Sequence, residues 1–572
     1  LLEAASADRL VLGPPQPPHG RRHIVDAQQR QRLVRGVNIG LEWWADHGRP
    51  IDPAAYAAGR CPPLNTSQDA HWSQPPVCEV DAGRGKWNQS TDPLSRNDLA
   101  QIRALGFTAI RLAISWSLLE PAPGRYSDMY LDRIEQVVGW AAEQDVHTIV
   151  DFHQDNYAYF VPGGGADGAP AWACPAAISY NDSSVISSLE RQLLEKILGD
   201  HTDYLNPLIA FETFWRNAEV RESPFGGGLQ EHYARAVAQV VRRLRDNDAV
   251  LGYELMNEPL PGVSLANLDP FTFANETLYP FYRRLAQALT GVRDSLPPCP
   301  PLHPWPVCKG PPASCRRTED LGCAVPELGT RTEQILFFEP IGLRNEFDVS
   351  PQRITSPWTS YPNIVYAPHT YTGSFTLIKH GKLAPQYNVS LDTAWEEAVP
   401  MRAGVFVTEF GSTPQSASSK LARIVEEQDK HLTGSTFWIW KESGGGWGLF
   451  DGPAEGAPAG TPNGQLRPDY VAQVSRVLPL ATVGTLDSFR YNAFLNTTQI
   501  FVMQATAPAA DSASGLDAES LVYIPAHVDR ADGELEASGS AKLAGVDRQP
   551  DGSRVVRVAV VRDGGKYTVT LG

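Results

Sequence analysis

The sequence of 572 residues lacks any long apolar run. A helix that crosses a bilayer needs about 20 consecutive apolar residues, and polar residues interrupt every apolar stretch of this chain before that length. Internal repeats and coiled-coil heptads are absent as well. These absences exclude a membrane-spanning protein, a repeat solenoid and a fibrous rod. Transient contact with a membrane surface stays open.

Basic residues are in the minority, because 49 Lys and Arg stand against 65 Asp and Glu, for a formal net charge of −16. The acidic residues are spread over many segments and form no long run. Binding to a nucleic-acid backbone or to an anionic membrane surface requires clustered basic charge. We therefore expect neither as the main partner, and a neutral partner such as a sugar fits the composition better.

Cysteine is scarce, and the seven residues lack the paired C-x₂-C spacing of a structural zinc site. Six of them fall in two irregular segments, namely Cys61 and Cys78 in the first and Cys299, Cys308, Cys315 and Cys323 in the second. We interpret these as disulfide staples, which leaves Cys174 free. Zinc held near His303 is the weaker alternative. The sequence predicts no metal ion and no cofactor.

The chain begins at Leu1-Leu2-Glu3 without a basic region followed by an apolar one, so we expect a processed product whose signal peptide is not visible. Six Asn-x-Ser/Thr sequons start at Asn65, Asn88, Asn181, Asn275, Asn388 and Asn496. Sequons and clustered cysteines together favour the secretory pathway, with a secreted or lysosome-like destination for a disulfide-bonded glycoprotein. A bacterial secreted origin is the alternative.

Short β-rich apolar runs alternate with helical periodicity from about residue 33 onward. The predicted strands are Leu33–Ile39, Ala109–Ile114, His147–Phe152, Leu251–Met256, Ile335–Phe338, Ile364–Ala367, Val405–Thr408 and Ser435–Ile439. The predicted helices between them include Ser95–Leu105, Met129–Glu143, Gln230–Arg245, Leu278–Leu289 and Leu391–Val399. Eight strands that alternate with helices predict an α/β fold, a (β/α)₈ TIM barrel.

The length of the chain predicts a second, smaller domain beside the barrel. After Tyr470 helical periodicity ends, and strands are predicted at Ile500–Ala505, Ser520–Ile524, Arg554–Val561 and Tyr567–Leu571. We predict an N-terminal extension at 1–32, the barrel at 33–477 and a C-terminal antiparallel β-sandwich at 478–572. Long insertions at about 43–92 and 297–326 interrupt the barrel. The first of these follows a strand and should border the catalytic face.

Two glutamates stand where predicted strands end. Glu258 closes the fourth strand in Asn257-Glu258-Pro259, and Glu409 closes the seventh in Glu409-Phe410-Gly411. Barrels keep their chemistry at the carboxyl ends of the strands. Hydrolysis of a glycosidic bond with retention needs two carboxyl groups about 5 Å apart, one protonated to assist the leaving oxygen and one ionised to attack the anomeric carbon. The pair predicts a retaining β-glycosidase, although each glutamate alone also fits a helix cap or an ion pair.

Further polar or aromatic residues also follow or end predicted strands, namely Arg111, His153, Asp155, Asn257, His369, Tyr371 and Trp440. With the two glutamates they resemble glycoside hydrolase family 5. Longer motifs narrow the resemblance to the endoglycoceramidase-like branch, which cleaves glycan from ceramide. Those motifs are Arg35-Gly36-Val37-Asn38, Leu118-Leu119-Glu120-Pro121, His153-Gln154-Asp155, the stretch from Gly165 to Trp172, and Phe214-Trp215 with the later stretch from Gly228 to Tyr233. The resemblance runs from about residue 33 to 572.

The resemblance implies a role for each of these residues. Glu258 becomes the acid/base, Glu409 the nucleophile, Asn257 a ligand of the sugar 2-hydroxyl, Arg111 and Tyr371 the groups that hold and ionise Glu409, His369 the neighbour of Glu258, and Trp440 the floor of the first sugar subsite. A nearby Arg lowers the pKa of a carboxyl group, which agrees with an ionised Glu409. His153 and Asp155 either contact sugar hydroxyls or form a structural hydrogen bond.

Some alternatives stay open at this point. Trp438 shares strand parity with Trp440 and is the alternative sugar platform, while Glu339 is expected to support the site and Glu254 and Glu120 to be structural. The implied substrate is a glycosphingolipid cut between glycan and ceramide. The alternatives are a β-glucosidase acting on steryl glucoside or glucosylceramide, a β-glucanase on the same scaffold, and a non-catalytic carbohydrate-binding protein. The sequence predicts no nucleic-acid partner and does not indicate an oligomeric state.

Overall fold

The structure is a computed structural model that describes residues 8–41, 94–158, 160–161, 164–165, 168–174, 205–220, 223–263, 269–294, 328–350, 357–372, 386–412, 417–442, 446–452, 464–492, 499–510, 519–528 and 530–572. The two predicted insertions and the six clustered cysteines lie outside these residues. Cys174 lies inside them, and its thiol is free and buried. None of the described helices combines the length and the apolar character that crossing a bilayer requires.

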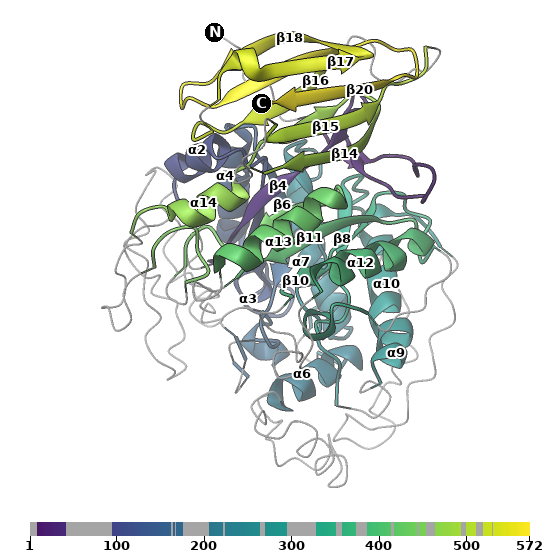
Figure 1. The fold of residues 1–572 in the computed structure, drawn as a ribbon. Coiled ribbons are helices and arrows are strands. Elements are labelled where there is room, and N and C mark those ends of the chain that lie inside the picture. Colours follow the sequence, from purple (N-terminus) through teal and green to yellow (C-terminus); the bar gives the residue numbers. More distant parts are fainter. Residues whose placement is uncertain are drawn as a thin grey trace, which may run out of the picture.

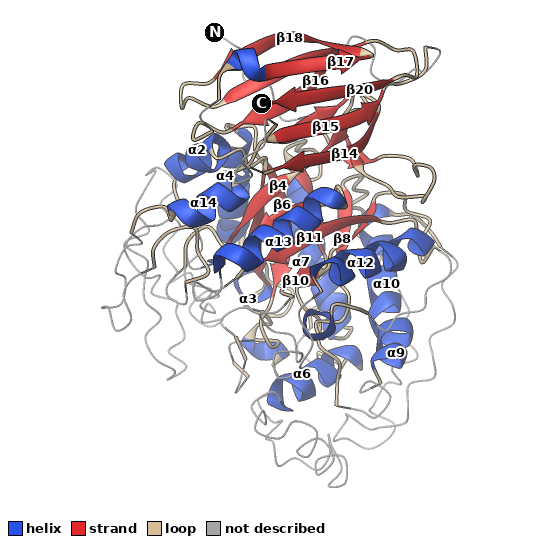
Figure 2. Cartoon of the chain, viewed as in Figure 1, coloured by secondary structure: helices blue, strands red, loops and turns tan. Residues whose placement is uncertain are grey.

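A closed ring of parallel strands forms the centre of the molecule (Figures 1 and 2). In ring order the strands are β4 (Arg35–Ile39), β5 (Ala109–Ser115), β6 (His147–His153), β7 (Val250–Glu254), β8 (Ile335–Phe338), β9 (Ile364–Tyr366) followed by β10 (His369–Thr370), β11 (Gly404–Phe410) and β12 (Gly434–Phe437). β12 pairs with β4 and so closes the ring. The TIM barrel is confirmed, and each predicted strand overlaps an observed one.

Helices surround this ring (Figure 2). They include α2 (Arg96–Ala104), α3 (Trp116–Leu119), α4 (Asp128–Ala142), α6 (Leu205–Trp215), α7 (Leu229–Leu244), α10 (Tyr279–Thr290), α12 (Tyr387–Met401), α13 (Ala417–Lys430) and α14 (Pro468–Val474). Capping explains where several begin and end. Ser95 and Asp98 form a reciprocal capping box that starts α2, and α10 ends at Gly291, whose φ of 74° is a left-handed conformation that favours glycine.

The first described residues close the amino-terminal end of the barrel. Leu10, Leu12 and Ile24 are buried and form one hydrophobic cluster with residues from the first half of the barrel strands, among them Ile335 and Phe406. Arg22 fastens this segment, because its Nη1 donates to the carbonyl oxygens of Pro362 (2.7 Å) and Arg402 (2.9 Å). We call residues 8–25 the floor segment, since they fill the end of the barrel opposite the carboxyl ends of its strands.

The C-terminal part consists of two antiparallel sheets at the upper end of the view in Figure 1. Their strands are β13 (Leu478–Thr482), β14 (Thr485–Tyr491), β15 (Phe501–Thr506), β16 (Glu519–Ile524), β17 (Leu535–Gly539), β18 (Ala541–Arg548), β19 (Arg554–Val560) and β20 (Lys566–Leu571). The sandwich is confirmed, but it also contains β1 (Val11–Leu12), β2 (Ile24–Val25) and β3 (Gln31–Arg32), because β3 pairs with β13. The N-terminal extension is therefore joined to the sandwich.

Candidate active site

Glu409 is held at the carboxyl end of β11 and is 5% exposed. Its Oε1 accepts a hydrogen bond from Nη1 of Arg111 at 2.6 Å, and its Oε2 accepts one from the hydroxyl of Tyr371 at 2.8 Å. Burial raises the pKa of Glu409 above its ordinary value, against His369 and Arg111, which lower it. The net direction is opposite to the one expected from Arg111 alone, because the sequence did not reveal how completely this carboxyl is buried.

Glu258 follows β7 and lies in a more open position, with 31% of its side chain exposed. Its Oε1 lies 2.7 Å from Nδ1 of His369 and accepts a hydrogen bond from Nδ2 of Asn345 at 2.5 Å. The backbone of Glu258 has a φ of +37°, and its N–H donates to Oε2 of Glu339 at 3.1 Å. A non-glycine residue in this conformation is strained, and such strain is common where a side chain must be aimed at a site.

The two glutamates face each other across His369. One oxygen of Glu258, one oxygen of Glu409 and a ring nitrogen of His369 all lie within 4.8 Å of one another. Retaining glycosidases place their two carboxyl groups about 5–5.5 Å apart, whereas inverting ones need about 6.5–9.5 Å to admit a water molecule. The spacing of Glu258 and Glu409 fits retention.

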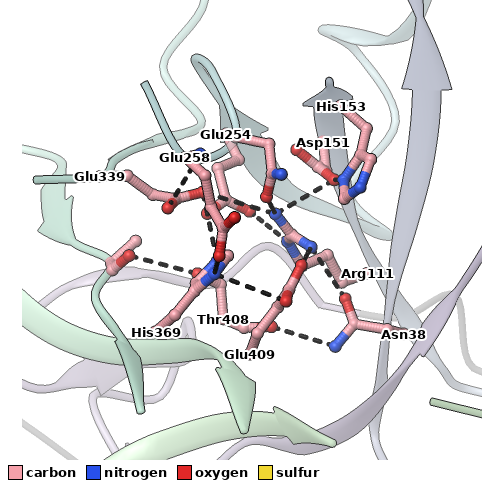
Figure 3. Close-up of polar contacts among 12 residues, drawn as sticks. Asn38, Arg111, Asp151, His153, Glu254, Glu258, Glu339, His369, Thr408 and Glu409 are labelled. Carbon is pink, nitrogen blue, oxygen red and sulfur yellow. Dashed lines mark hydrogen bonds and ion pairs between the residues drawn. The ribbon is translucent and has the colours of Figure 1, made fainter. Parts of the chain in front are cut away.

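Arg111 is the hub of the site (Figure 3). Its side chain is completely buried, and it contacts Glu409 at 2.6 Å, Asn257 Oδ1 at 2.7 Å and Asn38 Oδ1 at 3.0 Å. It also pairs with Glu254 and with Asp151, the latter at 3.1 Å. Burial disfavours the charged form, but the surrounding carboxylates outweigh it and raise the pKa of Arg111. Arg111 is therefore a permanent cation among buried acidic groups.

Two groups of residues around Arg111, each with two glutamates and His369, also have the spacing of a metal site. Glu254, Glu339 and His369 bring their ligand atoms within 4.8 Å of one another, as do Glu258, His369 and Glu409. The guanidinium of Arg111 already pairs with one or two carboxylates of each set. A metal cation would have to compete with that fixed positive charge, so we assign no metal to the described site.

His153 and His369 lie on opposite sides of Arg111 in Figure 3. Nδ1 of His153 contacts Oδ2 of Asp151 at 2.6 Å, and its Nε2 lies 3.8 Å from Oδ2 of Asp155. Burial lowers the pKa of His153, but Asp151 and Asp155 outweigh it and raise that pKa well above the ordinary value. The side chain of Asp155 is 51% exposed. Asp155 therefore has surface available for a ligand, whereas the side chain of His153 is buried against Asp151.

Asn257 is almost completely buried, and both ends of its amide have protein partners. Its Oδ1 accepts from Arg111, and its Nδ2 donates to the carbonyl oxygen of Gln154 at 2.9 Å. Asn38, which ends the motif Arg35-Gly36-Val37-Asn38, also accepts from Arg111 and donates to the carbonyl oxygen of Thr408 at 3.1 Å. The role of Asn257 as a ligand of the sugar 2-hydroxyl stays a prediction.

Trp440 does not lie where the resemblance placed it. Its side chain is 1% exposed, its Nε1 donates to Oδ1 of Asp98 at 3.0 Å, and Phe450 packs edge-on against its ring. A ring that is buried in this way cannot form the floor of a sugar subsite. Trp438 is the half-buried tryptophan of this segment, and its ring stacks on His153 with 5.7 Å between centroids and 10° between planes. Of the two alternatives, Trp438 is the one beside the site.

The structure also shows site residues that were missed. Asp151 stands two residues before His153 on β6, so its strand parity is a signal in the sequence. Asn345 lies on α11 (Arg344–Phe347), which follows β8, and has no sequence signal. Trp447 lies edge-on to Tyr371 with 5.6 Å between ring centroids. Glu120, in contrast, pairs with buried His232 outside this cluster and is structural, as expected.

Comparison with known proteins agrees with this geometry. Residues 73–281 match the family model described as cellulase (glycosyl hydrolase family 5). Over 562 residues the chain is 23% identical to endoglycoceramidase I of Rhodococcus hoagii, which covers 95% of this chain and 87% of that protein. Over 189 residues it is 28% identical to a glucosylceramidase of Rhizopus delemar. This match covers 30% of the present chain and only 27% of the glucosylceramidase.

Solved structures give the same answer for the fold. A crystal structure of an endogalactoceramidase superimposes with a TM-score of 0.63 and covers 99% of this chain and 100% of its own. The sequence identity in this comparison is 20%. At that identity the likeness shows the shared architecture, a barrel with an attached sandwich, and the chemistry must come from the residues of the site.

Proposed function

Because residues 73–281 match the model of glycoside hydrolase family 5, we propose that Glu409 and Glu258 hydrolyse a β-glycosidic bond with retention of configuration. The observation that carries this proposal is the spacing of the two carboxylates, which bring oxygens within 4.8 Å of one another. Their surroundings divide the roles. Glu409 is buried and receives hydrogen bonds from Arg111 and Tyr371, as suits a nucleophile. Glu258 is partly exposed, as suits a group that exchanges protons with substrate and water.

The proposed reaction has two steps. In the first, the protonated carboxyl of Glu258 gives its proton to the leaving oxygen while an oxygen of Glu409 forms a bond to the anomeric carbon. In the second, the carboxylate of Glu258 takes a proton from water, whose oxygen attacks the anomeric carbon and releases Glu409. The negative charge thus moves from Glu409 to Glu258 and back again.

We propose a glycosphingolipid as the substrate, cut between glycan and ceramide. The similarity to an endoglycoceramidase over most of the chain supports this choice. A second support is local. The acid/base must face the leaving group, and Asn345, which donates to Glu258, lies on α11. On and just after that helix, Phe347 and Val349 are 51% and 43% exposed. Exposed apolar residues on the leaving-group side fit a lipid aglycone and transient contact with a membrane surface.

Two other enzymatic activities have specific support. A β-glucosidase acting on glucosylceramide or a steryl glucoside is favoured by the shorter match to a glucosylceramidase. A β-glucanase is favoured by the family model, whose description is cellulase. A non-catalytic carbohydrate-binding protein has less support, because both glutamates stand at a reactive spacing.

The decisive experiment offers the protein glucosylceramide, a ganglioside, a steryl glucoside and a soluble glucan, and identifies the products by mass spectrometry. Release of an intact oligosaccharide together with ceramide supports the proposal, and turnover of the glucan alone overturns it. Glu258→Ala and Glu409→Ala should each lower the rate by several orders of magnitude. Glu120→Ala is the matched control, since Glu120 is equally a buried barrel glutamate but pairs with His232.

We also propose that the protein is a glycoprotein of the secretory pathway. Two of its sequons lie in the described residues, and both Asn275 and Asn388 are exposed, so an oligosaccharide can be attached there. Treatment of the natural protein with an N-glycosidase should lower its mass. An unchanged mass would contradict the proposal.

A further inference from the structure

Glu339 is a third glutamate directly behind the pair. It follows β8, is 2% exposed and reaches both members of the site that handle protons. Its Oε2 accepts from the backbone N–H of Glu258 at 3.1 Å, and its Oε1 lies 3.2 Å from Nε2 of His369 and 3.5 Å from Nη2 of Arg111. Figure 3 shows Glu339 and His369 on the same side of Glu258. All three neighbours of this carboxylate are N–H groups or protonatable nitrogens.

His369 has carboxylate oxygens at both ring nitrogens. Nδ1 lies 2.7 Å from Oε1 of Glu258 and 3.4 Å from Oε2 of Glu409, while Nε2 faces Glu339. A neutral imidazole has one N–H and one lone pair, so the lone pair would point either at Glu339 or at the pair Glu258 and Glu409, one of which is ionised in each half of the reaction. An imidazolium donates at both nitrogens. The ring is completely buried, and the arrangement therefore favours the doubly protonated form.

Charge balance gives the same result. The site assembles five carboxyl groups, namely Asp151, Glu254, Glu258, Glu339 and Glu409, around the single guanidinium of Arg111. Buried carboxylates need paired cations. Among the described residues, His369 is the protonatable group that contacts Glu258, Glu339 and Glu409 together. Burial lowers the pKa of His369, but Glu339 and Glu409 outweigh it and raise that pKa well above its ordinary value.

We propose that Glu339 is a positioning residue that keeps His369 doubly protonated, so that its Nδ1–H faces the pair of glutamates in both halves of the reaction. This inference rests on the proposed function. In the free enzyme the charge lies on Glu409, and in the glycosyl-enzyme it lies on Glu258. Nδ1 is within reach of both, at 3.4 and 2.7 Å. Glu339 touches neither reacting carboxyl and acts through His369 and through the backbone of Glu258.

Other titratable groups face this pair of residues and set the background against which Glu339 acts. They are Arg111, Asp155, Glu254, Glu258, Tyr282, Tyr371 and Glu409. Around Glu409 the groups with the largest influence on its pKa are His369, Arg111, Glu258 and His153, and Glu339 is not among them. Removing the charge of Glu339 should therefore reach Glu409 through His369.

Glu339→Gln tests the proposal, because an amide has two N–H groups of its own. If its oxygen keeps the hydrogen bond from the N–H of Glu258, its NH₂ group faces Nε2 of His369, which must then accept a hydrogen bond and be neutral. Glu409 loses a neighbouring cation, and the loss of an opposite charge raises the pKa of a carboxyl. The acidic limb of the pH profile of kcat/KM, which reports the ionisation of Glu409, should move upward by about one pH unit or more.

The assay uses an aryl β-glycoside with a good leaving group, so that it does not depend on the lipid substrate. Glu339→Asp keeps the negative charge and should keep the acidic limb near that of the wild type, even at a lower rate. Glu120→Gln is the matched control for an amide in a buried glutamate–histidine pair, because Glu120 contacts His232 at 2.6 Å. A Glu339→Gln enzyme that loses rate with both limbs unmoved overturns the inference.

A second readout separates this inference from the proposed function. In protein labelled with ¹⁵N-histidine, the ring nitrogens of His369 should both be protonated at pH 7 in the wild type and only Nδ1 in Glu339→Gln. The same ionisation state in both proteins overturns the inference, whether or not glycosides are hydrolysed. If the wild type hydrolyses no β-glycoside, the proposed function fails, and the spectra still decide the role of Glu339.

Discussion

Replacing Arg111 by Lys tests whether the site needs a guanidinium or only a positive charge. Five partners lie within 3.1 Å of the guanidinium of Arg111, namely Asn38, Asp151, Glu254, Asn257 and Glu409, and Glu339 lies farther away at 3.5 Å. A guanidinium offers five N–H donors in a fixed fork, whereas an ammonium offers three. At least two of the five contacts must therefore be lost. At about 1.5–3 kcal/mol for a hydrogen bond to a charged group, the free energy of unfolding should fall by about 3–6 kcal/mol.

The effect on rate follows from Glu409 alone. Loss of the hydrogen bond at Oε1 of Glu409 should remove about 1.5–3 kcal/mol of transition-state stabilisation, which corresponds to a fall in kcat/KM of about 10- to 150-fold. Chemical denaturation measures the first quantity, and turnover of an activated aryl β-glycoside measures the second. Arg35→Lys is the matched control, because Arg35 is also a buried barrel arginine but binds Ser435 and Asp429 away from the two glutamates.

Arg35→Lys should lower stability and leave kcat/KM unchanged. The reasoning would be refuted by an Arg111→Lys enzyme with near wild-type stability and rate, since an ammonium group would then serve as well as a guanidinium. A loss of rate shared equally by Arg35→Lys would also refute it, because the effect would then be one of general stability.

Three further predictions follow from single contacts. Tyr371→Phe removes the hydrogen bond to Oε2 of Glu409, which favours the ionised form, so the acidic limb of kcat/KM should rise in pH. Trp438→Ala should raise KM for a β-glycoside at little cost in stability. Trp440→Ala should instead lower the free energy of unfolding by about 3–5 kcal/mol, because the ring of Trp440 is buried. The opposite pattern would restore Trp440 as the sugar platform. Leu10→Ala should lower the unfolding free energy by about 2–5 kcal/mol while kcat per folded molecule stays constant, and a selective loss of kcat would contradict a purely structural floor segment.

The barrel strands were predictable because they are buried on both faces. β5 and β11 appear in the sequence as nearly continuous apolar runs, as parallel strands do. The glutamates were predictable for a related reason, since both stand at the carboxyl end of such a run. Their roles remain predictions, and the structure adds only that the spacing and the contacts suit them.

The misplacement of Trp440 has a physical cause. Strand parity predicts the direction of a side chain only while the strand continues, and β12 ends at Phe437. Beyond that residue the alternation no longer applies, and Trp440 points into the core toward Asp98. The shared contacts of Arg111 were hidden for another reason. Inward-pointing side chains from different strands of a barrel meet in layers, and no local pattern shows which residues share a layer.

The floor segment was not predictable, because its strands are two residues long and period-two alternation needs more positions than that. Its role comes from distant partners. One of them is Pro362, whose carbonyl oxygen accepts from Nη1 of Arg22 across 340 positions of the chain. The next strand, β3, pairs with β2 of the floor segment and is also held by a distant residue, because the N–H of Leu486 donates to Oε1 of Gln31 across 455 positions.

This pairing has a consequence for biosynthesis. The strand β3 leaves the ribosome before any strand of the barrel, but its partner β13 is made only after the whole barrel. The strand β3, which pairs with β2 of the floor segment, therefore cannot complete its own hydrogen bonding until the C-terminal sheet begins to form, and contacts so far apart in sequence form slowly. A premature stop in the last hundred or so codons would leave the two glutamates encoded and the strand β3 without its partner.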